Sequence, residues 1–295
     1  MDKVFYGMIP PPKSWSQEKV EEWIGELASL LKRENISSIN LPEVIDEIRE
    51  EERTVPLIEK MDNLKFSELI KKACPDLCVY LNKVTVQLSE KKFMEWVAQA
   101  NQAGIKDLIL VGGEKNSTQE IGLSVVHAAE CVKNNFPKIN LGGITIFTRK
   151  GEAQRIFDKM QHGMCFFVSQ IIFETANVKC VLLALEKLCR ASEQKMPRIY
   201  LSLATATSKI DIEFMQWLGV EFPTAVWSYF MDKKENEINE RVFEVLNFNL
   251  VEIEHFLSET NMDLGFNVEQ LMYKNRGSGE RLLKLIRARL KSPIG

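Results

Sequence analysis

Short apolar runs alternate with longer segments of helical periodicity along most of the chain. The apolar runs are unbroken rather than interleaved with polar positions, and many of their residues are β-branched, as in strands that are covered on both faces. Between these runs, apolar residues recur at every third or fourth position, as in helices that bury one face. The pattern therefore predicts a series of strand–helix units.

The predicted strands cover residues 3–9, 36–41, 78–86, 107–111, 139–147, 165–173, 198–204 and 266–271. The predicted helices cover residues 16–33, 55–73, 90–103, 122–135, 152–160, 178–191, 210–218 and 280–290. An extended helical segment around 227–262, with its clearest pattern over 237–259, precedes the last strand and departs from the regular order.

Eight strand–helix units in order favour a closed ring of parallel strands, because each helix returns the chain to the next strand. The predicted fold class is therefore α/β, a (β/α)8 TIM barrel that forms a single domain over residues 1–295. An open doubly wound sheet is the alternative, but it normally has a glycine-rich turn after its first strand, where this chain has Pro10, Pro11 and Pro12. In a TIM barrel the functional residues lie at the carboxyl ends of the strands, so we expect the site there.

Composition narrows the classes of partner. The formal net charge is −3, which argues against a protein that binds nucleic acid or an anionic membrane. No apolar run has the length of a membrane span, and no secretory signal precedes the first predicted strand. The 6 cysteines and 3 histidines are scattered and form no recognisable metal-ligand set. We therefore expect a cytoplasmic protein with reduced cysteines, no metal site, and no nucleic-acid or membrane partner.

Six strings of residues stand at or near the predicted strand ends. They are V-F-Y-G-M-I-P-P-P-K (4–13), E-R-T (52–54), A-G-I-K-D-L-I-L-V-G-G-E (103–114), I-T-I-F-T-R-K-G-E-A (144–153), D-K-M-Q-H-G (158–163) and F-F-V-S-Q-I-I-F-E (166–174). Their order and approximate spacing are similar to those of the methylenetetrahydrofolate reductase family, over roughly the whole barrel and most weakly beyond Thr205. The resemblance implies a divergent reductase-like oxidoreductase of folate one-carbon metabolism, with its pterin at the carboxyl ends of the strands. It also implies FAD and NAD(P)H as candidate cofactors.

Three residues match positions with which the family contacts the pterin. Gln170, which holds the folate in the family, interrupts an apolar strand and can both donate to and accept from a heterocycle; the alternative is a structural amide bonded to neighbouring backbone. Glu114 replaces a family Asp and follows two glycines, so it can lie close to a ligand and move a proton; the alternative is a surface carboxylate. Asn82 stands where the family has a strand-three His. We predict that all three bind the substrate and that Glu114 is catalytic.

Three further residues match positions with which the family contacts the flavin. Thr54 corresponds to a Thr that hydrogen-bonds the flavin, and Lys159 to a Lys that contacts its phosphates. Lys150 replaces a His on the loop after the fifth strand. The resemblance therefore implies a cofactor-binding role for Thr54, Lys150 and Lys159. The alternatives are a helix-capping threonine and solvated lysines.

The sequence departs from the family pattern at three positions. Gly7 stands where the family has the strand-one Glu that acts as general acid. Gly112 replaces an Arg that binds the flavin phosphates, and Ile146 replaces an aromatic residue that packs on the flavin. Loss of an acid and of a charge-assisted phosphate contact removes several kcal/mol of binding and transition-state stabilisation, since each such interaction typically contributes about 1–3 kcal/mol. The standard flavin mechanism is therefore not expected to survive intact.

Three functional hypotheses follow. The first is a reductase in which Glu114 or water supplies the proton, and hydride comes from a weakly held flavin or directly from NAD(P)H. The second is a non-redox folate- or pterin-binding protein of the methyltransferase type, or a methyl-carrier partner subunit. The third is a non-catalytic scaffold. In the first two the partner is a folate or pterin small molecule, and the hypotheses leave open a homo-oligomer or a protein partner.

Overall fold

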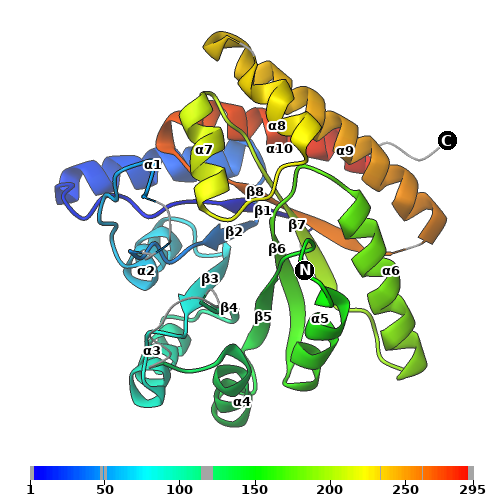
Figure 1. The fold of residues 1–295 in the computed structure, drawn as a ribbon. Helices are drawn as coiled ribbons and strands as arrows, with labels where there is room; N and C mark the ends of the chain where they lie inside the picture. The colour runs from blue at the N-terminus through cyan, green and yellow to red at the C-terminus, as the bar shows by residue number, and fades with distance from the viewer. Residues whose placement is uncertain are drawn as a thin grey trace.

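Eight parallel strands close into a barrel in chain order, with each strand hydrogen-bonded to its sequence neighbours and β8 to β1 (Figure 1). The computed structural model describes residues 3–46, 49, 52–113, 122–232, 234–260 and 262–291. Helices cover the outside of the ring and pack on the outward-facing residues of the strands. The predicted (β/α)8 TIM barrel is confirmed.

The strands are β1 (Val4–Gly7), β2 (Ser38–Leu41), β3 (Cys78–Val84), β4 (Asp107–Val111), β5 (Asn140–Thr145), β6 (Met164–Ile171), β7 (Arg198–Ala204) and β8 (Leu264–Glu269). The helices are α1 (Gln17–Arg33), α2 (Asn63–Ala73), α3 (Glu90–Gln102), α4 (Val125–Asn135), α5 (Glu152–Gln161), α6 (Ala176–Ala191), α7 (Lys209–Trp217), α8 (Thr224–Met231), α9 (Ile238–Thr260) and α10 (Arg276–Lys291). Short 3₁₀ turns precede α9 (Glu235–Glu237) and α10 (Tyr273–Asn275).

The largest difference from the predicted elements lies before α2. The predicted helix 55–73 begins only at Asn63, because the Asp62 side chain caps α2 by accepting a hydrogen bond from the Lys65 amide at 2.9 Å. The backbone before it is used elsewhere: the Met61 amide donates to the Pro11 carbonyl at 2.8 Å. The chain between β2 and α2 is therefore a long loop, tied to the loop after β1.

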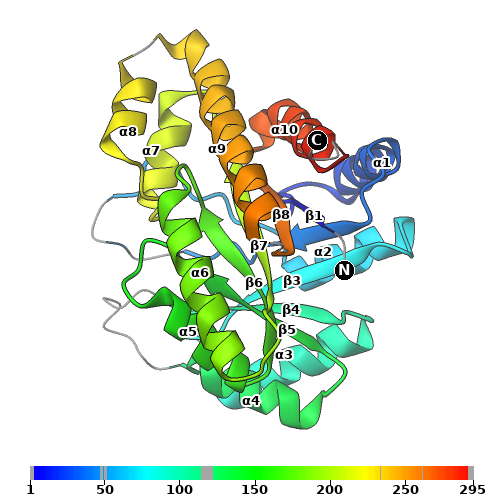
Figure 2. The same ribbon diagram turned by 90° about the vertical axis from the view of Figure 1, so that its right-hand side faces the viewer.

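The segment between β7 and β8 adds helical structure beyond one unit of the ring. Figure 2 shows α7 and α8 beside one another past the carboxyl ends of β6 and β7, with α9 leading back along the outside of the barrel. α9 packs against α8 and α10. Within the described residues, none of the helices is both long and apolar enough to cross a bilayer.

The amino-terminal half of the barrel interior is filled by rings, which we call the aromatic layer: Phe5, Tyr80, Phe166 and Tyr200. The ring centroids of Phe5 and Tyr200 are 3.8 Å apart and the two rings are stacked. Gly265 on β8 makes room for them, because a Cβ there would lie 2.3 Å from the Tyr200 ring. This half is therefore a packed floor and not a channel.

The carboxyl-terminal half of the interior carries polar side chains, which we call the polar layer: Asn40, Asn82, Gln170, Ser202, Asn267 and Glu269. Alternate residues of a strand face the same side of a sheet. Asn82 follows Tyr80 by two positions, and Ser202 follows Tyr200 in the same way. On β3 and β7 the interior face therefore changes from a ring to a polar side chain toward the carboxyl end of the strand.

Candidate active site

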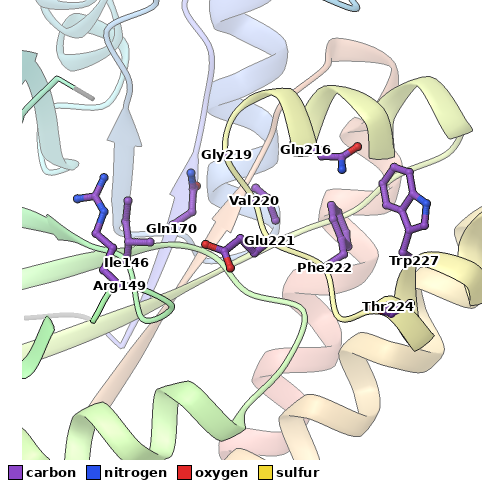
Figure 3. Close-up of a pocket in the computed structure, with 10 residues that line it drawn as sticks. All are labelled: Ile146, Arg149, Gln170, Gln216, Gly219, Val220, Glu221, Phe222, Thr224 and Trp227. Atoms are coloured by element: carbon purple, nitrogen blue, oxygen red, sulfur yellow. The ribbon is translucent and has the colours of Figure 1, made fainter. Parts of the chain in front are cut away.

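A pocket of about 600 Å³ opens at the ends of β5 and β6, against the segment that joins α7 and α8 (Figure 3). Ile146, Arg149 and Gln170 line one side, and Phe222 and Trp227 line the other. A concave space lined by aromatic side chains together with a few polar or charged groups is typical of small-molecule sites. The pocket therefore lies where the sequence places the site, at the carboxyl ends of the strands.

Gln170 projects from β6 into this pocket and is already held at both ends. Its Nε2 donates to the Leu218 carbonyl at 2.9 Å, and its Oε1 accepts from the Ile171 amide at 3.0 Å. A glutamine amide has two N–H groups and two acceptor sites on its oxygen, so one of each remains for a ligand. Gln170 therefore fastens the α7–α8 segment to β6 and also lines the pocket, and its predicted contact with a folate stays a prediction.

The far wall of the pocket is fixed by packing and by one hydrogen bond. The ring centroids of Phe222 and Phe173 are 4.7 Å apart and the rings are stacked, and Trp227 lies 5.6 Å from Phe222. The Thr148 hydroxyl donates to Glu221 Oε1 at 2.7 Å, which ties the wall to the loop after β5. The wall is therefore positioned in advance of any ligand, which lowers the entropic cost of binding.

Glu269, the last residue of β8, is the titratable group of the polar layer. Its Oε1 accepts from Asn267 Nδ2 at 3.0 Å, and the same amide donates to Ser202 Oγ at 2.9 Å. Burial raises the pKa of Glu269 to about 7, and hydrogen bonds from Ser202 and Asn267 only partly oppose this. The side chain remains partly exposed. A carboxyl group with a pKa near 7 is protonated in a substantial fraction of molecules at neutral pH. It can therefore donate a proton to a ligand at the carboxyl-terminal opening of the barrel, which we call the mouth.

Gly7 lies beside Glu269 on the adjoining strand. β1 and β8 pair with Tyr6 opposite Val268, so Gly7 and Glu269 are the next residues on the two strands. A Cβ on Gly7 would lie 3.0 Å from the Val268 carbonyl oxygen and 3.3 Å from the Glu269 Cα. The strand-one position is therefore crowded by β8, and the carboxyl group beside it comes from β8.

Three amide oxygens in the polar layer lack a hydrogen-bond partner within the described part of the chain: Oδ1 of Asn40, of Asn82 and of Asn267. Buried polar atoms are almost always hydrogen-bonded in folded proteins, and these three oxygens expose almost no surface, so they fit a bound water molecule or a donor group of a ligand that enters the layer. The amino and ring N–H groups of a pterin are such donors. Asn82, predicted from the sequence, lies among these acceptors.

The predicted cofactor residues are not brought together. Thr54 is exposed on the loop between β2 and α2. Lys150 is exposed in the turn before α5, and its neighbour Arg149 lines the pocket instead. Lys159 Nζ donates to the Ile144 carbonyl at 2.8 Å, and its burial between α5 and the barrel lowers its pKa. Glu114, predicted as the catalytic residue, lies outside the described residues.

These positions bear on FAD. The family binds the flavin phosphates with an Arg and a Lys, but this chain has Gly112 for the Arg, and its matching Lys159 is bonded to backbone behind the strands. Ile146 lines the pocket where the family has an aromatic residue that packs on the flavin. The described residues therefore do not fit FAD as the family holds it.

Cations reach the mouth from the loop between β2 and α2. The guanidinium carbon of Arg53 lies 4.7 Å from the Trp217 ring centroid on α7, and that of Arg49 lies 5.0 Å from it. Lys60 Nζ lies 4.9 Å from the Tyr273 ring, and burial together with the nearby Arg53 charge lowers its pKa. These contacts place cationic groups beside Trp217 and Tyr273, on a loop that by sequence carries 8 carboxylates and 3 cations over residues 42–62.

The sequence does not single out Glu269. Its strand, F-N-V-E-Q-L, mixes apolar and polar residues, so one carboxylate there does not stand out as Gln170 does in its mostly apolar strand. The family resemblance is weakest in this part of the chain and supplies no match for Glu269. The loop cations were also missed, because their contacts with α7 connect parts of the chain that are far apart in sequence.

One group with metal-ligand chemistry lies outside the barrel. Single ligand atoms of Glu90, His127 and Cys131 lie within 4.8 Å of one another on α3 and α4. His127 Nε2 and Glu90 Oε2 are 2.9 Å apart, both side chains are exposed, and the Glu90 carboxylate raises the pKa of His127. The contact is an ordinary surface pair and plays no part in the site at the strand ends.

Comparison with known proteins gives a family and a fold. The model of a family described as mycobacterial methylenetetrahydrofolate reductase matches residues 24–226. No curated protein matches the chain. A solved structure, described as an uncharacterized protein from Clostridium thermocellum that binds two copies of 5-methyl-5,6,7,8-tetrahydrofolic acid, is similar with a TM-score of 0.79 at 20% identity, over 97% of this chain and 94% of that one. A structure from Aquifex aeolicus VF5 has a TM-score of 0.57 at 11% identity, over 99% and 94%. At these identities the structural likeness shows the fold.

Proposed function

The chain belongs to the mycobacterial methylenetetrahydrofolate reductase family, and we propose from this that it reduces the methylene group of 5,10-methylenetetrahydrofolate to a methyl group with hydride taken directly from NAD(P)H. The observation that carries the proposal is the polar layer, in which buried amide oxygens without a partner among the described residues and one partly exposed carboxyl group lie in the carboxyl-terminal half of the barrel interior. The similar protein that binds 5-methyl-5,6,7,8-tetrahydrofolic acid supports a folate site in a barrel of this kind.

In this proposal the pterin and the remainder of the folate contact different groups of side chains at the mouth. The polar layer suits the pterin, because its free acceptors match the pterin donors and Gln170 retains one donor and one acceptor. The rings of Phe222 and Trp227 suit the aminobenzoyl group, which is flat and apolar. Arg149, exposed on the pocket rim, suits a glutamate carboxylate. Each part of the ligand therefore meets side chains of matching chemistry.

NAD(P)H is the proposed hydride donor because the described residues do not fit FAD in the family manner. A nicotinamide dinucleotide carries a pyrophosphate, and Arg53 and Lys60 on the loop between β2 and α2 supply cations close to the mouth. In this proposal the dinucleotide enters as a substrate and leaves oxidised. The protein binds and orients both substrates and excludes water between them.

A spectrum and a titration test the proposal. We expect the purified protein to be colourless, to bind 5-methyltetrahydrofolate in the micromolar range or tighter, and to oxidise NAD(P)H only when methylenetetrahydrofolate is added, in order-of-magnitude terms with a kcat of about 1–1000 per second. A bound yellow chromophore that is reduced by NAD(P)H would contradict direct transfer. Folate binding without NAD(P)H oxidation would favour the methyl-carrier hypothesis. The glycine at position 7, where the family has its general acid, also suits that hypothesis. Binding of neither ligand would contradict the proposal altogether.

A further inference from the structure

We propose that Glu269 on β8 is the general acid of this mouth, in place of a strand-one carboxylate, because the chain has Gly7 at that position. The inference rests on the proposed reduction of methylenetetrahydrofolate. It adds a catalytic residue that the resemblance to the family does not supply, since the family carries its acid on the first strand and this chain has glycine there.

The position of Glu269 supports this role. Adjacent strands lie about 4.8 Å apart, so a carboxyl group from β8 reaches the space beside β1 without a change in the barrel. A side chain on Gly7 would approach the Val268 carbonyl oxygen at 3.0 Å through its Cβ alone. The two observations are complementary, because the backbone that crowds a side chain at Gly7 belongs to the strand that provides Glu269.

The surroundings of Glu269 hold its carboxyl group in one place. Asn267 Nδ2 donates to its Oε1 at 3.0 Å, and Asn267 is itself fixed by its hydrogen bond to Ser202 Oγ at 2.9 Å. Burial raises the pKa of Glu269, and within the described residues no charged side chain contributes to the shift. At neutral pH a substantial fraction of the carboxyl groups is therefore protonated and oriented, as a general acid requires.

The proton from Glu269 and the hydride from the nicotinamide together account for the reduction of the methylene group. The neutral carboxyl group donates its proton to N10 of methylenetetrahydrofolate while the bond between N10 and the methylene carbon breaks, and the electron pair of that bond remains on N10. The methylene carbon is left in an iminium ion with N5. Hydride from the nicotinamide ring adds to this carbon, so the carbon is reduced to a methyl group and the nicotinamide is oxidised. The Glu269 carboxylate then recovers a proton from solvent.

Asp107 is a second buried carboxyl group of the barrel and serves as a control for Glu269. Asp107 opens β4 at the amino-terminal end of the interior, pairs with Tyr80 across the sheet, and accepts from Asn140 Nδ2 at 2.9 Å. Burial raises the pKa of Asp107 as it does that of Glu269. Asp107 lies beside the aromatic layer and not at the mouth, so it shares the burial of Glu269 without access to substrate.

The experiment compares Glu269→Gln, Asp107→Asn and Glu114→Gln in the full-length protein. For Glu269→Gln we expect kcat for NAD(P)H oxidation to fall about 100-fold or more, while the affinity for 5-methyltetrahydrofolate changes little, because glutamine keeps the oxygen that accepts from Asn267. The wild-type kcat should decline above about pH 7, and this limb should be absent in Glu269→Gln. Asp107→Asn should retain both kcat and the limb.

Two outcomes would overturn the inference. Unchanged kcat in Glu269→Gln, with the loss found in Glu114→Gln instead, would assign the acid to Glu114. A ¹³C NMR titration of labelled glutamates that finds no carboxyl group titrating near pH 7, or finds one that persists in Glu269→Gln, would remove the chemical basis for the role, and this readout needs neither substrate nor activity. Failure of the proposed function has a different signature, because the wild-type protein itself would then not oxidise NAD(P)H in the presence of methylenetetrahydrofolate.

Discussion

The amino-terminal and carboxyl-terminal halves of the barrel interior are built from opposite kinds of side chain. The aromatic layer buries rings against one another, whereas the polar layer leaves amide oxygens without a partner within the described residues. Ring burial stabilises the folded state, and unpartnered polar atoms cost it free energy. The comparison indicates that the floor of the barrel is organised for stability and its mouth for binding.

The two buried carboxyl groups make the same comparison at the level of single residues. Asp107 and Glu269 both face the interior, and burial raises the pKa of each. Asp107 lies at the packed end and is bonded to Asn140, whereas Glu269 lies at the open end and is held by Asn267. A raised pKa alone therefore does not identify a functional group; access from the mouth distinguishes the two.

The largest expected effect on stability lies in the aromatic layer. Phe166→Ala should reduce the free energy of unfolding by about 3–5 kcal/mol, because it leaves a cavity among packed rings. Phe248→Ala on α9, where the side chain is 64% exposed, should change it by less than about 0.5 kcal/mol. Urea unfolding measures both. An equal loss in the two variants would contradict the assignment of stability to the floor.

The next effect in size is the dependence of stability on pH. Because the pKa of Glu269 rises from 4.5 to about 7 on folding, the folded protein binds more protons than the unfolded chain between these values. The free energy of unfolding should therefore decrease as pH rises through this window, by up to about 3 kcal/mol from this group. Unfolding at about pH 5 and pH 8 should show a smaller decrease in Glu269→Gln than in the wild type.

Asp107 contributes to this dependence in the same direction, because its pKa is also raised. Asp107→Asn therefore separates the two groups, and the difference between Glu269→Gln and wild type should persist in that background. A Glu269→Gln profile identical to that of the wild type would show that the carboxyl group is solvated in the folded protein.

Gln170→Ala should have an intermediate effect on ligand binding. Loss of the amide should weaken binding of 5-methyltetrahydrofolate by about 1–3 kcal/mol, through one contact to ligand and through release of the α7–α8 segment from β6. Gln161→Ala is the matched control, because Gln161 is an exposed glutamine on α5 bonded to Gln194 at the surface. Isothermal titration would measure both affinities. Equal affinities in wild type and Gln170→Ala would place the ligand elsewhere.

The smallest effect distinguishes two neighbouring cations at the rim. Arg149→Ala should weaken folate binding by about 0.5–1.5 kcal/mol and make it less sensitive to salt, because the guanidinium lines the pocket. Lys150→Ala should leave the affinity unchanged, although Lys150 is the residue that matches the family position. The reverse result would show that the family match predicts the contact better than the pocket does.

Sequence reasoning predicted the barrel well because each strand carries its own local signal. β4 and β7 have the predicted bounds, and Ser16 caps α1 where the sequence indicated a helix start. The start of α2 could not be predicted from periodicity, because the stretch before it pairs with the loop after β1. Helical spacing of apolar residues over 55–62 was outweighed by these long-range hydrogen bonds.

The site was predicted less completely than the fold. Gln170 stands out because an amide in a mostly apolar strand is unusual, whereas Glu269 lies between Asn267 and Gln270 and gives no such signal. By contrast, no local signal relates Arg53 to Trp217, because the closure of the ring brings the loop after β2 close to α7. The family match predicts a phosphate contact for Lys159, and the structure directs its ammonium group to the Ile144 carbonyl, a long-range contact that the match does not contain.

The aromatic layer affects the route by which a proton could reach Glu269. The rings pack the amino-terminal half of the described barrel interior, so in the proposed mechanism Glu269 would receive its proton from the carboxyl-terminal side. With folate and dinucleotide bound there, the Glu269 carboxylate would be shielded from solvent and would regain a proton only after the products leave. Each proposed catalytic cycle would then include one protonation by this residue.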